Sequence, residues 1–308
     1  MNKVINFHNV KDSSWFEMTI TILKSKYTMI GIGELESYYY EGKNLKNVCH
    51  ITIDDGDKTF YDVIFPILKK HNIPATIFVS PLICKVGKNF WFQEIQGYNE
   101  IEMKKIIFEH VKIDNHIISK YSAESILKSL DIDLIWEIIL AYQKLFNIKV
   151  KKPQNMNLDQ LLEIDRHGLV VIGAHTETHP ILANEDDERS QKEIVDSIEG
   201  LRNILNHEIT YFAYPNGTPK LDFGKREIDI LKTNNCKIAF SLEPENFTII
   251  NHPLSIPRYG LSIGGANFIK TKLFFGKYWE KMKNVRWEEE SKVRKSISLS
   301  FFDQNYMD

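Results

Sequence analysis

Short apolar runs alternate with longer amphipathic segments along most of the chain. Apolar residues recur at helical spacing at Tyr61, Ile64, Phe65 and Leu68. Helices are also predicted over MNLDQLLEIDRHG, which Gly168 stops, and over residues 185–205 and 223–235. Strands are predicted at KVINFH, YTMIGI, VCHITI, IPATIFV, LVVIGAH, ITYFAYP, CKIAFSL and LSIPRYG. This alternation predicts an α/β fold with a parallel sheet covered by helices, and the number of units favours a barrel over an open sheet.

Residues 82–155 interrupt the alternation and are long for a single strand-to-helix connection. Aromatic residues come early, in NFWFQ, and helical patterns follow, of which the stripe from Leu134 to Tyr142 is the clearest. We expect a helical insertion at about 82–155 within a barrel that spans 1–265, followed by a C-terminal extension over 266–308. The insertion would lie at the strand ends where barrel enzymes build their sites.

Composition excludes several functional classes. The chain has 308 residues, is 43% hydrophobic and carries a formal net charge of −2, so bulk charge gives no reason to expect nucleic acid as a partner. Cys49, Cys84 and Cys236 have no metal-type spacing and are expected to be reduced thiols. No apolar window is long enough for a membrane span, and the first residues do not form a signal peptide, so a cytoplasmic protein is expected.

Polar residues with catalytic potential follow two of the predicted strands. Asp54 and Asp55 come directly after VCHITI, while His175 ends LVVIGAH and His179 follows four residues later. Two imidazoles at this spacing bind one divalent ion when the segment is tightly turned, and either Asp54 or Asp55 is the natural third ligand. The carboxyl ends of parallel barrel strands share one face, so these residues are expected to converge.

A third cluster, YFAYPNGTP, follows another predicted strand and indicates a tight turn with exposed backbone N–H groups. Such groups stabilise a developing oxyanion. Each of the three clusters taken alone is most often a simple turn or a chance match. Their order, and their position after apolar strands at comparable points of the repeat, favour a functional site.

TIDDGD, HTETHP and FAYPNG, in this order, resemble the first three motifs of the polysaccharide deacetylase (NodB-homology) family, in the subgroup with a Phe-Ala-Tyr-Pro third motif. The resemblance implies a distorted (β/α) barrel and metal-dependent removal of acetyl groups from N-acetylated sugars. It implies that Asp54 is the general base, that Asp55, His175 and His179 hold the metal, and that the backbone N–H of Asn216 helps bind the oxyanion. Two histidines and one aspartate suit zinc first, with cobalt, nickel or iron as alternatives.

The sequence departs from the family pattern at two places. Ala213 stands where the family's third motif usually has an arginine that orients the base; Arg258 in IPRYG is a candidate replacement, and a surface salt bridge is the alternative for it. The late Leu-x-His motif, which supplies the general acid, is not evident. His8 and His252 are candidates for that role, although a lone histidine is more often structural or exposed.

Residues 270–286, KTKLFFGKYWEKMKNVR, carry six basic residues and one glutamate. This segment is expected to dock on the barrel as a terminal helix; the alternative is an interfacial helix near anionic lipid, which would suit a lipid-linked glycan at the inner membrane face. The expected activity is deacetylation of an N-acetylated sugar, oligosaccharide or lipid-linked glycan in surface-polysaccharide assembly. Two alternatives are hydrolysis of another non-peptide C–N bond at the same metal site and a catalytically silent barrel that binds glycan.

Overall fold

The structure is a computed structural model that describes residues 1–111, 115–275, 292, 294 and 297. Its centre is an eight-stranded sheet in the order β7-β6-β5-β4-β3-β1-β8, with β2 paired to β3 beside this path. The strand pairs of this sheet are all parallel. The strands are β1 (Lys3–Phe7), β2 (Thr28–Ile30), β3 (Val48–Ile53), β4 (Ala75–Val79), β5 (Val170–Ala174), β6 (Tyr211–Ala213), β7 (Ile238–Phe240) and β8 (Tyr259–Gly260).

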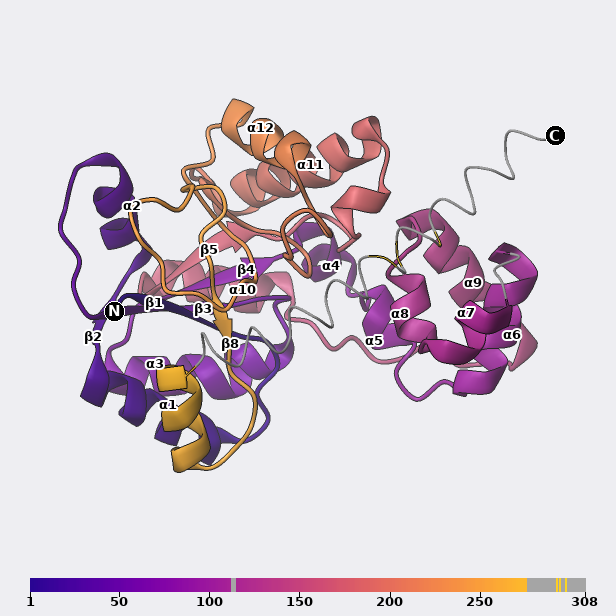
Figure 1. Ribbon diagram of the computed structural model, residues 1–308, viewed down its shortest axis with the longest axis horizontal. Helices are drawn as coiled ribbons and strands as arrows, with labels where there is room; N and C mark the ends of the chain where they lie inside the picture. The colour runs from indigo at the N-terminus through magenta and orange to yellow at the C-terminus, as the bar shows by residue number, and fades with distance from the viewer. Residues whose placement is uncertain (112–114, 276–291, 293, 295–296, 298–308) are drawn as a thin grey trace.

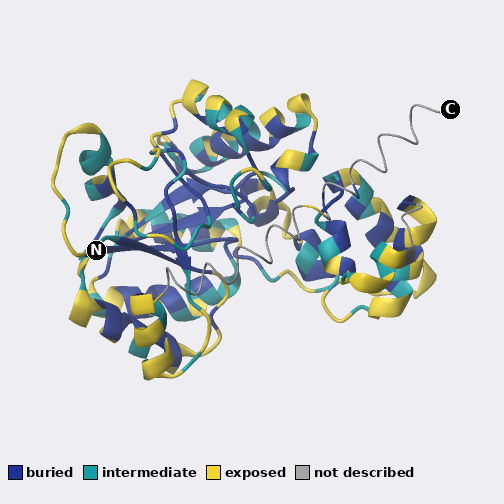
Figure 2. Cartoon of the chain, in the orientation of Figure 1, coloured by how far each residue is buried: buried dark blue, intermediate teal, exposed yellow. Residues whose placement is uncertain are grey.

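The two ends of this strand order are linked to each other. Ile256, just before β8, forms a parallel bridge with Phe240 of β7, and Tyr259 of β8 pairs with Ile5 of β1. The sheet therefore curls round on itself (Figure 1), and the predicted distorted (β/α) barrel is confirmed. β1, β3 and β4 are buried at every residue (Figure 2). This is expected because helices cover the outside of a parallel barrel and the side chains of its own strands fill the inside.

Helices surround the strands, with α1 and α3 on one side of the sheet and α11 and α12 on the other (Figure 1). The helices are α1 (Ser13–Lys26), α2 (Ile32–Tyr40), η1 (Phe60–Ile64), α3 (Phe65–His71), α4 (Pro81–Val86), α5 (Trp91–Glu94), α6 (Glu100–Val111), α7 (Asn115–Lys120), α8 (Ala123–Leu127), α9 (Ile132–Leu145), α10 (Leu158–His167), η2 (Leu182–Asn184), α11 (Asp187–Leu205) and α12 (Lys225–Thr233).

Local sequence signals fix several helix ends. Asn157 caps the start of α10 by accepting a hydrogen bond from the N–H of Gln160, and Gly168 ends that helix at φ 72°, as predicted. The strand predicted at YTMIGI is wrong at its end. β2 stops at Ile30, and α2 begins at Ile32, because the Glu34 carboxylate turns back to accept the N–H of Gly31.

Helices α5–α9 form a lobe beside the barrel (Figure 1) and pack around a hydrophobic cluster of their own, which includes Trp91, Ile107, Ile135 and Ile139. The chain rejoins the barrel where Asn155 forms an antiparallel bridge with Asp57. The Asn155 side chain also donates to the carbonyl oxygen of Lys88 at 3.2 Å, just before α5. Both ends of the lobe therefore lie next to the loop that follows β3, at the carboxyl ends of the strands.

Residues 266–275 are helical, and the rest of the predicted 270–286 segment lies outside the described residues. Among the helices that the structure describes, none combines the length and the apolar character that crossing a membrane requires.

Candidate metal centre

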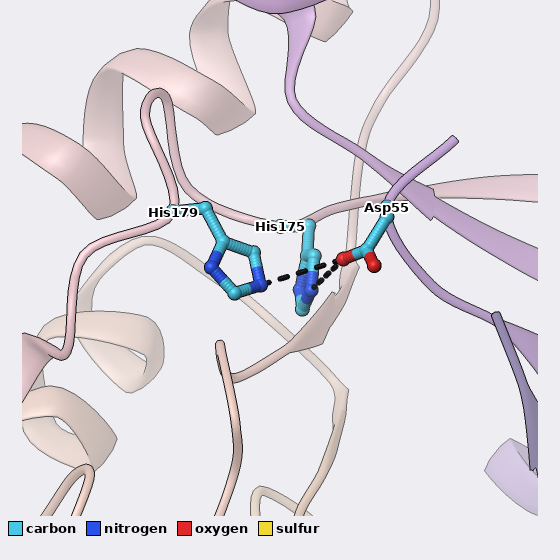
Figure 3. A group of neighbouring side chains, drawn as sticks. All are labelled: Asp55, His175 and His179. Atoms are coloured by element: carbon cyan, nitrogen blue, oxygen red, sulfur yellow. Dashed lines mark ion pairs between the residues drawn. The ribbon is translucent and has the colours of Figure 1, made fainter. Parts of the chain in front are cut away.

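Asp55, His175 and His179 meet at one end of the barrel, although 120 residues separate the aspartate from the first histidine. Asp55 follows β3, and both histidines stand on the loop that follows β5. One ligand atom from each residue lies within 4.8 Å of the other two. The Oδ1 atom of Asp55 is 3.4 Å from the Nε2 atom of each histidine (Figure 3).

The donor set fits a divalent cation. Nδ1 of His175 is 2.6 Å from the carbonyl oxygen of Ala213, so Nδ1 carries the proton and donates, which leaves the Nε2 lone pair directed at Asp55. All three side chains are buried, and Oδ1 of Asp55 accepts no hydrogen bond within the described chain. A buried carboxylate oxygen between two imidazole nitrogens is an arrangement that zinc or a similar ion would satisfy.

The backbone at this site adopts uncommon conformations. Positive φ angles occur at Asp55 (73°), Thr176 (61°), His179 (62°) and Asn216 (55°). Aspartate and asparagine tolerate this region, but a β-branched threonine does so rarely. Strain of this kind persists only where surrounding contacts impose it, and it is typical of functional loops.

Glu193 of α11 supplies such contacts to the loop between the two histidines. Its carboxylate accepts hydrogen bonds from the backbone N–H groups of Glu177 (3.0 Å) and Thr178 (2.8 Å) and from the Thr178 hydroxyl (2.6 Å). Within the loop, the Thr176 hydroxyl accepts the N–H of His179 at 3.1 Å. Sequence reasoning missed Glu193; the only signal is a carboxylate placed beside the apolar stripe of its helix.

Asp54, the predicted base, is held by Arg258. The guanidinium donates from Nη1 to Oδ1 at 2.8 Å and from Nη2 to Oδ2 at 2.9 Å, and both side chains are almost fully buried. Asn6 at the end of β1 donates a further hydrogen bond to Oδ2 at 3.0 Å. The structure thus places Arg258 where the hypothesis of a replacement arginine requires it, and the surface salt bridge is excluded by its burial. Asn6 was not anticipated.

These contacts set the charge of both carboxylates. Burial by itself would raise the pKa of Asp54, but the Arg258 guanidinium, with His175 and His8 nearby, outweighs it and lowers the pKa. Burial likewise opposes ionisation of Asp55, yet the imidazoles of His175 and His179, whose Nε2 atoms lie 3.4 Å from Oδ1, bring its pKa well below the usual range. Both acids are therefore ionised at neutral pH.

The two histidines respond differently to the same pocket. Burial lowers the pKa of His175, but the Asp55 carboxylate beside its Nε2 atom and the charge of Asp54 raise it by more. Burial prevails at His179 and lowers its pKa. A low pKa favours the neutral imidazole that a metal ligand requires.

The two candidate acids occupy opposite ends of the barrel. His8 follows β1 directly, and its Nε2 atom lies 4.0 Å from Oδ2 of Asp54, with about half of the side chain exposed. His252 is exposed in a turn, where its carbonyl accepts the N–H of Ser255, before the segment that pairs with β7. That turn is at the amino end of the strand direction, so the structure does not bring His252 to the metal centre.

Asn216 lies on the loop after β6, the strand next to β5, and therefore at the same edge as the histidines. Its Nδ2 atom is buried without a hydrogen-bond partner, and its backbone N–H donates to no acceptor in the part of the chain that the structure describes. Its predicted contribution to an oxyanion site stays a prediction.

The model of the polysaccharide deacetylase family matches residues 41–129 and 144–236. A poly-β-1,6-N-acetyl-D-glucosamine N-deacetylase of Staphylococcus aureus (strain MRSA252) is 29% identical over an alignment of 201 positions, which covers 60% of this chain and 67% of the relative.

Two solved structures share the fold. A Streptococcus pyogenes deacetylase in complex with acetate is 17% identical with a TM-score of 0.57, over 84% of this chain and 92% of that one. A de-N-acetylase from Aggregatibacter actinomycetemcomitans is 17% identical with a TM-score of 0.58, over 88% of this chain and 98% of that one.

Proposed function

The chain belongs to the polysaccharide deacetylase family, and from that premise we propose that it is a metal-dependent hydrolase that releases acetate from an N-acetylated glycan. The observation that carries the proposal is that a group of candidate metal ligands and an ionised carboxylate lie together at one end of the barrel. Asp55, His175 and His179 form a buried group of three candidate metal ligands. Asp54, next in the chain to Asp55, is an ionised carboxylate held by Arg258.

A divalent ion, which we propose to be zinc, would polarise the amide carbonyl and acidify a water molecule. Arg258 and Asn6 together donate two hydrogen bonds to Oδ2 of Asp54, whereas Oδ1 receives one, so Oδ1 keeps a free acceptor position. Oδ1 accepts a proton from the attacking water while the oxygen of that water bonds to the amide carbon. The N–H of Asn216 would then stabilise the charge that develops on the carbonyl oxygen.

Cleavage of the C–N bond requires a proton on the leaving nitrogen. His8 is the described histidine that lies beside Asp54 without belonging to the metal-ligand set, and its partial exposure gives it access to substrate. We assign it the role of general acid, so that the products are acetate and a free amine on the sugar.

The relatives named for poly-β-1,6-N-acetyl-D-glucosamine suggest the substrate to test first. The decisive experiment measures acetate release from β-1,6-linked N-acetylglucosamine oligosaccharides, other N-acetylated oligosaccharides and nucleotide sugars, with and without chelator. Chelator-sensitive acetate release supports the proposal. Chelator-sensitive release of a different amine product would favour hydrolysis of another C–N bond, and a metal-free protein without turnover on every substrate would favour a silent barrel.

A further inference from the structure

The helical lobe reaches the metal centre through an aromatic side chain, Phe92 of α5. The Phe92 ring lies 4.9 Å from the ring of His179, with an interplanar angle of 61°. It also lines a pocket of about 230 Å³ that Asp55 and His8 share. The lobe thus forms part of the wall of the cavity in which the chemistry would occur.

We propose that Phe92, together with the side-chain amides of Gln96 and Gln154, forms a subsite for the sugar ring that carries the acetyl group. This assignment rests on the proposed function and adds which part of the chain selects the sugar. It gives the insertion a direct part in recognition.

The position of Phe92 is fixed by its neighbours. Phe90 stacks on it at a centroid distance of 5.3 Å and an interplanar angle of 12°, which covers one face of the ring. The neighbouring Trp91 is buried in the core of the lobe, and its Nε1 atom donates to the carbonyl oxygen of His179 at 3.2 Å. These contacts connect the lobe core, the aromatic wall and a metal ligand in one rigid unit, so the wall is in place before substrate arrives.

The glutamines around the pocket divide into two kinds. Gln93 is buried, and its amide is used internally: Nε2 donates to Asn155, and Oε1 accepts the N–H of Phe90. Gln96 and Gln154 line the same pocket, yet their side-chain amides form no hydrogen bond within the described residues. Two amides, each with donors and an acceptor, are therefore available to a ligand at the rim.

This combination matches the surface of a sugar ring. A pyranose presents C–H groups on its flat face, which favour contact with the electron-rich face of an aromatic ring, and hydroxyl groups at its edge, which need donors and acceptors. The volume of the pocket corresponds to about eight water molecules at the liquid volume of about 30 Å³ each. This volume suits one sugar residue rather than several. Neighbouring sugars of a polymer would extend outside it.

The test uses metal-loaded protein and a pentamer of β-1,6-linked N-acetylglucosamine. Binding is measured by calorimetry in an Asp54→Asn background, and KM, kcat and metal content are measured with Asp54 intact. Phe92→Ala and Phe92→Leu should raise Kd and KM about tenfold or more with unchanged metal content, because Leu restores apolar volume but not the aromatic face. Phe92→Tyr keeps the aromatic face and should bind the pentamer as tightly as the parent protein does. Gln96→Ala and Gln154→Ala should each raise Kd by a smaller factor.

Phe108→Ala is the matched control, because this partly exposed ring belongs to α6 of the same lobe and lines a different pocket. If Phe92→Ala and Phe92→Leu lose metal and kcat while KM stays constant, Phe92 only supports His179, and the subsite is wrong. A parent protein that does not bind the pentamer also overturns it. Pentamer binding that depends on Phe92, without any acetate release, would support the subsite and refute the proposed reaction.

Discussion

Replacing Arg258 by alanine removes the cation that holds Asp54, and the consequence depends on pH. Both side chains are almost completely buried, with exposed fractions of 1% for Arg258 and 4% for Asp54, and they share two hydrogen bonds of 2.8 and 2.9 Å. Removing one partner of such a buried pair costs about 3–5 kcal/mol, because the other charge stays buried without compensation. We expect a loss of this size at neutral pH.

The sign of the pH dependence follows from the lowered pKa of Asp54. A lowered pKa stabilises the folded state above the pKa of the unfolded carboxyl, about 3.9, and this contribution is lost as the pH falls through the folded pKa. In Arg258→Ala, burial is no longer offset by the guanidinium, so the pKa of Asp54 should rise. The stability difference between parent and variant should therefore be largest near pH 7 and shrink in acid.

Urea unfolding of parent and variant between pH 4 and pH 8, with metal supplied, measures this difference directly. The acid limb of kcat/KM against pH should also move to higher pH in Arg258→Ala, because the base becomes protonated earlier. A double-mutant cycle with Asp54→Asn isolates the pair. Arg226→Ala serves as the control, since this arginine pairs with Asp187 and Glu227 away from the site. A pH-independent stability difference with no coupling in the cycle would refute the reasoning.

Three further predictions concern the metal, its loop and the turn after β3. His175→Ala should lose both metal and turnover, whereas Asp54→Asn should keep the metal and lose turnover, as metal analysis and acetate release will show. Glu193→Gln should weaken metal affinity by about 10- to 100-fold, measured by competition with a chelator, because one carboxylate holds the loop between the histidines. Gly56→Ala should destabilise the fold by more than about 1 kcal/mol in urea unfolding, because φ is +68° and a Cβ would lie 2.9 Å from a valine of β4.

Each of these three predictions has a control variant or a result that would contradict it. Metal retained in His175→Ala but lost in Asp54→Asn would reverse the assigned roles. Glu199→Gln changes an exposed glutamate of the same helix and should leave metal affinity unchanged; equal effects of both variants would exclude a specific role for Glu193. Gly33→Ala, in a helix with open space around the new Cβ, should be neutral or stabilising, and a Gly56→Ala protein as stable as its parent would contradict the backbone argument.

The pattern of apolar runs determined most of the strands and the barrel. VCHITI matches β3 residue for residue, and the helices α10 and α11 lie within two residues of the predicted ends. These elements were predictable because buried parallel strands and amphipathic helices carry strong local signals. The end of the YTMIGI strand was not predictable in this way, because one contact, from the Glu34 carboxylate to the N–H of Gly31, starts a helix at that point.

The sequence by itself also predicted that an aspartate after VCHITI would converge with His175 and His179, because parallel strands present their carboxyl ends at one face. The choice of Asp55 over Asp54 as the candidate ligand rested on the family resemblance. Tertiary structure alone decided the rest. Arg258 reaches Asp54 across 204 residues, Asn6 joins it from β1, and Phe92 arrives from a separate lobe. These contacts depend on how the sheet curls and where the lobe docks, and no local pattern of residues encodes either of them.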